Sequence, residues 1–161
     1  MNNIKLIIGL GNPDSQYADT YHNVGHQAVD FLKNFQFSIF NFHLLKTDVY
    51  MNRSGWFVKE ALKKYKVKPE NLLIIHDDSD IELGKYKLSF GRGSAGHKGV
   101  QNIIAQLKTK NFWRLRVGTR PALAKPGQVK AEQLVLKKIS PAARKKLESV
   151  FKQITDQNLI I

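Results

Sequence analysis

The residues best suited to chemistry lie in and just after a glycine-rich turn near the start of the chain. His22 stands directly before a predicted helix, where the positive end of the helix dipole favours a neutral imidazole that can accept a proton. Asp77 follows another apolar run and could orient such a ring and stabilise its imidazolium. Asn12 and Asn52 also follow predicted strands, and their amide N–H groups could bind a carbonyl or a developing oxyanion. Since no serine or cysteine nucleophile stands beside His22, these residues indicate attack by water.

A dinucleotide site is a second interpretation of the same turn. Gly9-x-Gly11 begins the required pattern, but the third glycine would fall at position 14, which is Asp14. A carboxylate there would repel the pyrophosphate. The chain also has no phosphate-binding Gly-Lys-Ser/Thr sequence, so we do not expect a nucleotide cofactor.

A metal site is the third interpretation. His22 and His26 are four residues apart and would share a helix face, as paired zinc ligands do, but no third ligand stands out in the sequence. Asp77, Asp78 and Asp80 could hold Mg²⁺, although such a cluster in a turn is more often solvated. We therefore expect a hydrolytic site without a metal.

Alternating apolar runs and amphipathic segments predict the elements that place these residues. Residues 76–80 are expected to form an acidic turn and residues 91–99 a glycine-rich loop, while Ser54 is a candidate N-cap. The pattern predicts one α/β domain over residues 1–161, a three-layer sandwich with a mixed, mainly parallel sheet flanked by helices. Strands are expected at 4–8, 37–40, 44–50, 72–75, 85–90 and 112–118, and helices at 23–35 and 54–65. Two further helices are expected, one that carries Val100, Ile103, Ile104 and Leu107 and a last one that buries Leu147, Val150, Phe151 and Ile154.

The charge of the chain indicates a polyanionic partner. Residues 1–80 contain 9 basic and 9 acidic residues, whereas residues 81–161 contain 17 basic and 4 acidic ones, so the whole net charge of +13 lies in the second half. Such a lopsided field favours a nucleic acid. The chain has no cysteine and no apolar run near the ~20 residues that span a bilayer. We expect a cytoplasmic protein, and its size suggests a monomer.

The motifs together resemble bacterial peptidyl-tRNA hydrolase over nearly the whole chain and in the same order. The resemblance rests on Gly-Leu-Gly-Asn-Pro at 9–13 with Tyr17, His22-Asn23-Val24-Gly25, Met51-Asn52-x-Ser54-Gly55, His76-Asp77-Asp78-x-Asp80, Leu83-Gly84-Lys85, Gly93-Ser94-Ala95-Gly96-His97-x-Gly99 and Arg114-Leu115-Arg116-Val117-Gly118.

The resemblance implies cleavage of the ester between a stranded peptide and the terminal ribose of tRNA. His22 would be the general base, Asp77 its partner, and Asn12 a contact to the peptide that helps to exclude substrates with a free amino terminus. The cleft at the aminoacyl end would be lined by Tyr17, Tyr50 and Asn52. The tRNA phosphates would be bound by Lys87 and Arg116.

Four departures from the family pattern stand out. Lys98 replaces the usual Asn in the cleft, where it adds a charge and cannot accept a hydrogen bond. Asp14 replaces a Gly, with little effect expected, and Tyr21 replaces an Arg. The segment between residues 35 and 50 and the C-terminus are expected to be shorter than in relatives. Because of Lys98, a non-catalytic RNA-binding relative is the alternative function.

Overall fold

The computed structural model describes residues 3–34, 42–125, 127–128 and 130–156. The strand predicted at 37–40, residues 35–41 of the segment expected to be shortened, and residues 157–161 lie outside this part of the chain.

One five-stranded sheet forms the middle of the molecule. Its strands are ordered β2-β1-β3-β5-β4. Neighbouring strands are parallel except for β4, which runs antiparallel to β5 at one edge. The mixed, mainly parallel sheet confirms the predicted fold class. The strands are β1 (Leu6–Gly9), β2 (His43–Lys46), β3 (Leu72–Glu82), β4 (Tyr86–Phe90) and β5 (Trp113–Arg120).

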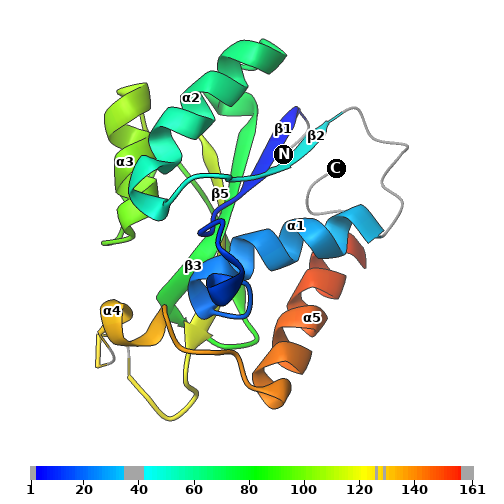
Figure 1. Ribbon diagram of the computed structural model, residues 1–161, viewed down its shortest axis with the longest axis vertical. Helices are drawn as coiled ribbons and strands as arrows, with labels where there is room; N and C mark the ends of the chain where they lie inside the picture. Colours follow the sequence, from blue (N-terminus) through cyan, green and yellow to red (C-terminus); the bar gives the residue numbers. More distant parts are fainter. Residues whose placement is uncertain (1–2, 35–41, 126, 129, 157–161) are drawn as a thin grey trace.

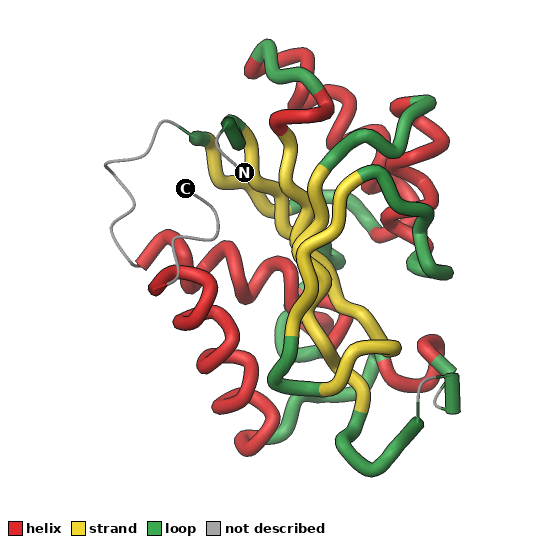
Figure 2. The backbone as a smooth tube through the Cα atoms, turned by 180° about the vertical axis from the view of Figure 1, so that it is seen from behind, coloured by secondary structure: helices red, strands yellow, loops and turns green. Residues whose placement is uncertain are grey.

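Helices cover both faces of this sheet. In Figure 1, α1 (Val24–Asn34) and α5 (Pro141–Asp156) lie on one side, and α2 (Ser54–Tyr65) and α3 (Lys98–Leu107) lie on the other. The short α4 (Ala131–Leu134) lies near one end of β3, and Figure 2 shows the same three layers from behind. Among the helices of the described residues, none combines the length and apolar content that a bilayer-spanning segment needs.

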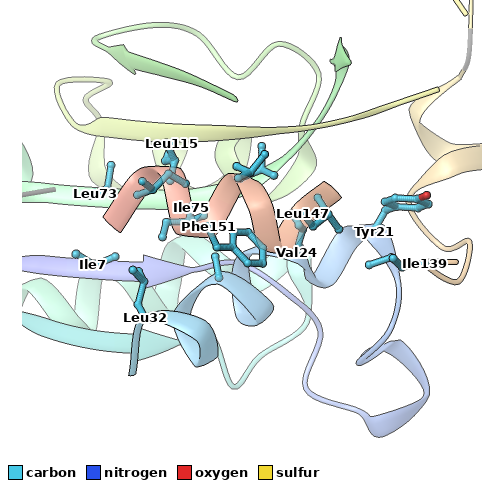
Figure 3. Close-up of a cluster of buried hydrophobic side chains, with 14 of the residues drawn as sticks. Ile7, Tyr21, Val24, Leu32, Leu73, Ile75, Leu115, Ile139, Leu147 and Phe151 are labelled. Atoms are coloured by element: carbon cyan, nitrogen blue, oxygen red, sulfur yellow. The ribbon is translucent and has the colours of Figure 1, made fainter. Parts of the chain in front are cut away.

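The two apolar layers follow from alternation along the central strands. Successive side chains of a strand point to opposite faces, so Ile7, Leu73 and Ile75 pack toward α1 and α5 (Figure 3). Leu6 and Ile74 instead pack toward α2 and α3. Because β1 and β3 are buried on both faces, they read as unbroken apolar runs in the sequence.

Two local predictions were wrong. Residues 76–80 are not a turn but part of β3, in which Asp77 and Asp78 pair with β5 at Val117 and Gly118. Acidic residues are disfavoured in strands, but both carboxylates have tertiary partners that the local sequence does not reveal. Ser54 is not the N-cap of α2, since its hydroxyl donates to the Met51 carbonyl from inside the first turn.

The backbone of α1 packs closely against the backbone of the sheet at Gly25. A Cβ on Gly25 would lie 2.4 Å from the Ile75 carbonyl oxygen and 2.5 Å from the Leu10 nitrogen, so only glycine allows this approach. The short turn η2 (Tyr21–Asn23) leads directly into α1. The approach therefore places His22 beside the buried end of β3.

Candidate active site

A cleft of about 850 Å³ opens at the carboxyl ends of β1 and the adjoining part of β3. Ligands of open α/β sheets bind at such an edge. The cleft brings together seven of the nine residues predicted for the site, all except Lys87 and Arg116. It is lined by Asn12, Tyr17, His22, Tyr50, Met51, Asn52, Asp77, Asp78, Ser79, Ala95, Gly96, His97, Lys98, Lys130, Glu132, Val135 and Leu136.

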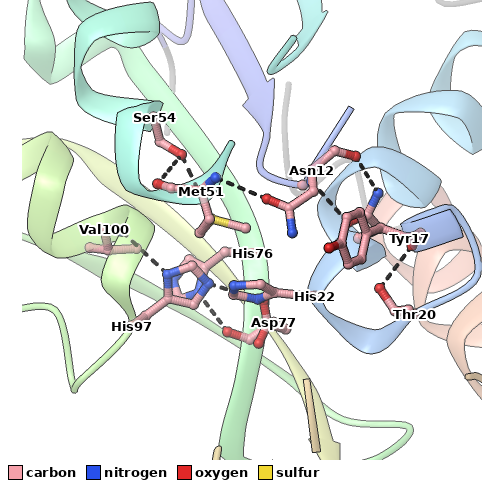
Figure 4. Close-up of polar contacts among 12 residues, drawn as sticks. Asn12, Tyr17, Thr20, His22, Met51, Ser54, His76, Asp77, His97 and Val100 are labelled. Carbon is pink, nitrogen blue, oxygen red and sulfur yellow. Dashed lines mark hydrogen bonds and ion pairs between the residues drawn. The ribbon is translucent and has the colours of Figure 1, made fainter. Parts of the chain in front are cut away.

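His22 and Asp77 form a hydrogen-bonded pair in this cleft (Figure 4). The distance from His22 Nδ1 to Asp77 Oδ1 is 2.9 Å, and the carboxylate is buried. An ionised carboxylate only accepts, so Nδ1 carries the proton and donates it to Asp77. The Nε2 of His22 is then the atom that can take a proton from water.

His97 donates to the same carboxylate oxygen, a contact that the sequence analysis did not predict. Its Nε2 lies 3.0 Å from Asp77 Oδ1, and its Nδ1 accepts the Val100 N–H at 3.3 Å. The Val100 donor requires a lone pair on Nδ1, which puts the ring proton on Nε2, facing Asp77. The sequence offered one signal for the orientation of His97. It follows a glycine-rich loop and precedes a helix, and a side chain at that position can serve as N-cap.

The three residues are arranged as a chain of hydrogen bonds. Among the described residues, His22, Asp77 and His97 are the group of potential ligands close enough together to hold a metal ion. Binding at His97 Nε2 would need the other tautomer, whose Nδ1–H would face the Val100 N–H. The geometry therefore favours proton transfer, as the sequence predicts for His22 and Asp77.

The charge of Asp77 is stabilised by these two rings. Burial by itself raises the pKa of the carboxyl, but the neighbouring imidazoles of His97 and His22 outweigh it, and the pKa lies well below its usual range. A depressed pKa means that this group stabilises the fold above its unfolded pKa of about 3.9, and that the contribution is lost as the pH falls further. Asp77 is therefore ionised at neutral pH.

Asn12 is held with its amide nitrogen free to face the cleft. Its Oδ1 accepts the Met51 N–H at 2.9 Å, which fixes the orientation of the amide. The backbone N–H and carbonyl of Asn12 both bond to the Asn23 side chain at 2.9 Å. With oxygen and backbone engaged, the Nδ2 group is the part of Asn12 that can donate to a substrate carbonyl.

Tyr50, which lines the cleft, is hydrogen-bonded to Asp14. The Tyr50 hydroxyl donates to the Asp14 carboxylate, and this hydrogen bond raises the pKa of Tyr50. The contact ties the turn after β1 to η4 (Met51–Arg53), which begins at the next residue. Asp14, expected to have little effect in place of glycine, therefore orients a residue predicted to line the cleft. Tyr17 and the exposed Asn52 line the same cleft.

Arg116 and Lys87 lie side by side on β5 and β4 rather than among the lining residues. Arg116 Nε donates to Asp78 Oδ2 at 2.7 Å, and only 19% of its side chain is exposed. Lys87 is exposed. Asp78 is thus paired with Arg116. Asp77, Asp78 and Asp80, the alternative magnesium ligands, do not form a group of converging ligand atoms among the described residues.

His26 supports the turn after β1 instead of pairing with His22. Its Nε2 lies 3.0 Å from Thr47 Oγ1, which also receives the Gly11 N–H and donates to the Gly11 carbonyl. Burial, with Lys46 nearby, lowers the pKa of His26 to about 4. A further histidine, His76, is fully buried, and burial holds its pKa well below its usual value.

Acid is expected to weaken the fold through these two histidines. Each is neutral when folded and takes up a proton near pH 6.5 when unfolded, so stability falls as the pH drops below 6.5. The free energy of unfolding should fall by up to roughly 1.4 kcal/mol per pH unit for each histidine, down to the folded pKa. Urea unfolding at pH 7, 6 and 5 measures this slope. His26→Gln should flatten it, whereas His43→Gln, at an exposed position, should not; equal slopes in all three proteins would contradict the assignment.

Comparison with known proteins decides the family. The family model described as peptidyl-tRNA hydrolase matches residues 6–160. The chain belongs to the peptidyl-tRNA hydrolase family. The peptidyl-tRNA hydrolase of Haemophilus influenzae is 39% identical over 97% of this chain and 89% of its own, and that of Onion yellows phytoplasma is 38% identical over 98% and 89%. The crystal structure of peptidyl-tRNA hydrolase from Acinetobacter baumannii matches with a TM-score of 0.79 and 31% identity, over 99% of this chain and 92% of that one.

Two of the departures from the peptidyl-tRNA hydrolase pattern differ in where they lie. Tyr21 is buried in the apolar core that includes residues of α1 and α5, so its side chain does not line the cleft as that of His22 does. Lys98 lines the cleft, and its Nζ lies 3.5 Å from Glu132 of α4. Glu132 had no predicted role. Lys98 thus adds a cation to the residues that line the cleft.

Proposed function

We propose that this chain hydrolyses the ester between a peptide, or an N-blocked amino acid, and the 3′ ribose of tRNA, so that free tRNA returns to translation. The observation that carries the proposal is the hydrogen-bonded group of His22, Asp77 and His97 at the wall of the cleft. Family membership supports the same reaction.

The geometry supports a general-base mechanism. His22 Nε2 removes a proton from water while the water oxygen forms a bond to the ester carbon. The bond from that carbon to the ribose oxygen then breaks, and the imidazolium returns the proton to the leaving oxygen. Asp77, ionised and fixed by His97, stabilises the imidazolium between the two steps.

The amides of the cleft bind the acyl part of the substrate in this proposal. Asn12 Nδ2 donates to the carbonyl of the first peptide bond, which an aminoacyl-tRNA with a free amino group lacks. Tyr17, Tyr50 and Asn52 line the remainder of the acyl end. The developing oxyanion is stabilised by uncharged amide donors, which need no compensating charge in the cleft.

Release of N-acetyl amino acid from N-acetylaminoacyl-tRNA tests the function. Wild-type protein should release it at catalytic enzyme concentration, and unblocked aminoacyl-tRNA should react much more slowly. If the wild type binds tRNA but releases no product even at stoichiometric enzyme, the chain is an RNA-binding relative, the alternative function. The intact His22–Asp77 pair favours the enzyme.

Binding of tRNA is expected to depend on salt, because contacts would be made mainly to the RNA backbone. Lys87 is exposed beside the partly buried Arg116. Lys87→Ala should weaken binding to all tRNAs alike and reduce the slope of log Kd against log salt by about 1. Arg116 is unsuited to this test because removing it leaves Asp78 buried without its partner. An unchanged slope would exclude a phosphate contact at Lys87.

We further propose that the protein acts as a monomer in the cytoplasm. The size of the domain and the absence of cysteine support this setting. Light scattering after size-exclusion chromatography should give a mass near 18.4 kDa; a mass near twice that value would contradict the monomer.

A further inference from the structure

Lys98 and Glu132 face each other across the cleft. Lys98 is the first residue of α3 and Glu132 belongs to α4, and both line the cleft. Lys98 Nζ lies 3.5 Å from Glu132 Oε1, with 71% and 77% of the two side chains exposed. An ion pair this exposed is weak and is screened by salt. Both residues therefore remain available to a charged ligand.

The Glu132 side of the cleft is fastened to the segment that carries the base. The His22 N–H donates to the Val135 carbonyl at 2.8 Å, and the Tyr21 N–H donates to the Lys137 carbonyl at 3.3 Å. Leu134, at the end of α4, is buried. Glu132 thus belongs to the segment that is hydrogen-bonded to the backbone of His22, and its carboxylate reaches Lys98 at the start of α3. Figure 1 shows α4, which carries Glu132, near one end of β3.

Charge makes this glutamate unusual. Residues 81–161 contain 17 basic and 4 acidic residues, and Glu132 is the one of these four acids that lines the cleft in the described part of the chain. Salt largely screens an exposed carboxylate from distant charges, so the main effect of Glu132 is on the cation with which it pairs. Lys98 supplies that cation in the free protein.

The substrate brings an anion to the same place. The scissile ester must lie at His22, and the phosphodiester of the terminal nucleotide lies on the same ribose as that ester. It must therefore enter the cleft or its mouth. Among the described lining residues, the permanent cations are Lys98 and Lys130. Lys98 is attached directly to His97, which contacts the catalytic carboxylate.

We propose that Lys98 binds the phosphodiester of the 3′-terminal nucleotide, and that Glu132 is the counterion that this phosphate replaces. The proposal rests on the proposed function and names the residue that receives the RNA end. Glu132 then lowers the affinity of the cleft for its ligands, because a ligand must carry a phosphate to displace Glu132 from Lys98. Removing Glu132 and removing Lys98 should consequently have opposite effects on substrate affinity.

A double-mutant cycle in peptide release tests the exchange. Glu132→Gln should lower KM about threefold and Lys98→Gln should raise it about threefold, with kcat changed less than KM. In the Lys98→Gln background, Glu132→Gln should have little effect. Glu70→Gln, which removes a carboxylate at the opposite end of β3, is the matched control. If Glu132→Gln lowers KM equally in both backgrounds, Glu132 acts only through general charge and the proposal is overturned.

Binding of RNA hairpins separates this proposal from the hydrolase activity. One hairpin carries a single-stranded CCA end and the other lacks the terminal adenosine and its phosphate. Lys98→Gln should weaken binding of the first about threefold and leave the second unchanged. This result supports the phosphate contact even if no peptide is released. Equal weakening of both hairpins, or of neither, contradicts a contact to the terminal phosphate.

Discussion

Replacement of His22 by alanine is expected to lower kcat for peptide release by roughly 10²–10⁴-fold, the usual contribution of a general base. The reason is geometric: His22 is fixed by Asp77 through Nδ1, so its Nε2 is the basic atom offered to water in the cleft. Affinity for tRNA should change little, because the imidazole contributes nothing to the charge that attracts RNA. Single-turnover release and equilibrium binding measure the two effects separately.

His43→Ala is the matched control for this change. His43 is exposed at the amino end of β2, away from the cleft, where its ring lies 4.1 Å from that of Tyr65. It should leave kcat within about twofold, as surface substitutions usually do. Added imidazole should partly restore release by His22→Ala, which a misfolded cleft would not allow. If His22→Ala retains near wild-type kcat, another group is the base.

Replacement of Asp77 by asparagine should have the second largest effect, a fall in kcat on the order of 10²-fold or more. Asn keeps the shape but loses the charge that stabilises the imidazolium of His22. If its amide nitrogen turns toward either ring, it meets an N–H and forces the wrong tautomer. Two donors share Oδ1 in the native protein, so His22 and His97 should both lose their fixed orientation.

Asp80→Asn provides the comparison for Asp77→Asn. Asp80 lies on the same strand but is exposed and does not line the cleft. Asp80→Asn removes the same charge as Asp77→Asn and should change kcat less than about threefold. For Asp77→Asn, KM should stay within a few-fold of wild type while kcat falls. A rise in KM with kcat preserved would show that Asp77 serves binding and not the proton transfer.

Much of the scaffold is predictable because its signals are local. The apolar run that forms β1, the stripe of α1 and the boundaries of α2 all follow from residue periodicity. Strand β3 was predicted too short, since its polar end is stabilised by β5, His22, His97 and Arg116. Those partners are distant in sequence, and periodicity does not detect them.

The sequence alone predicted the pairing of His22 with Asp77 and the amide donors Asn12 and Asn52, because few residue types can act as base, carboxylate partner and uncharged donor. His22 stood before a predicted helix, and the other three followed predicted strands. Tertiary structure decided which side chains meet. It placed His97 on the oxygen that His22 also uses, tied Tyr50 to Asp14, buried Arg116 against Asp78 and set Glu132 opposite Lys98. The physical reason is that residue type fixes what a group can donate or accept, whereas only the packing of distant segments brings donor and acceptor into contact.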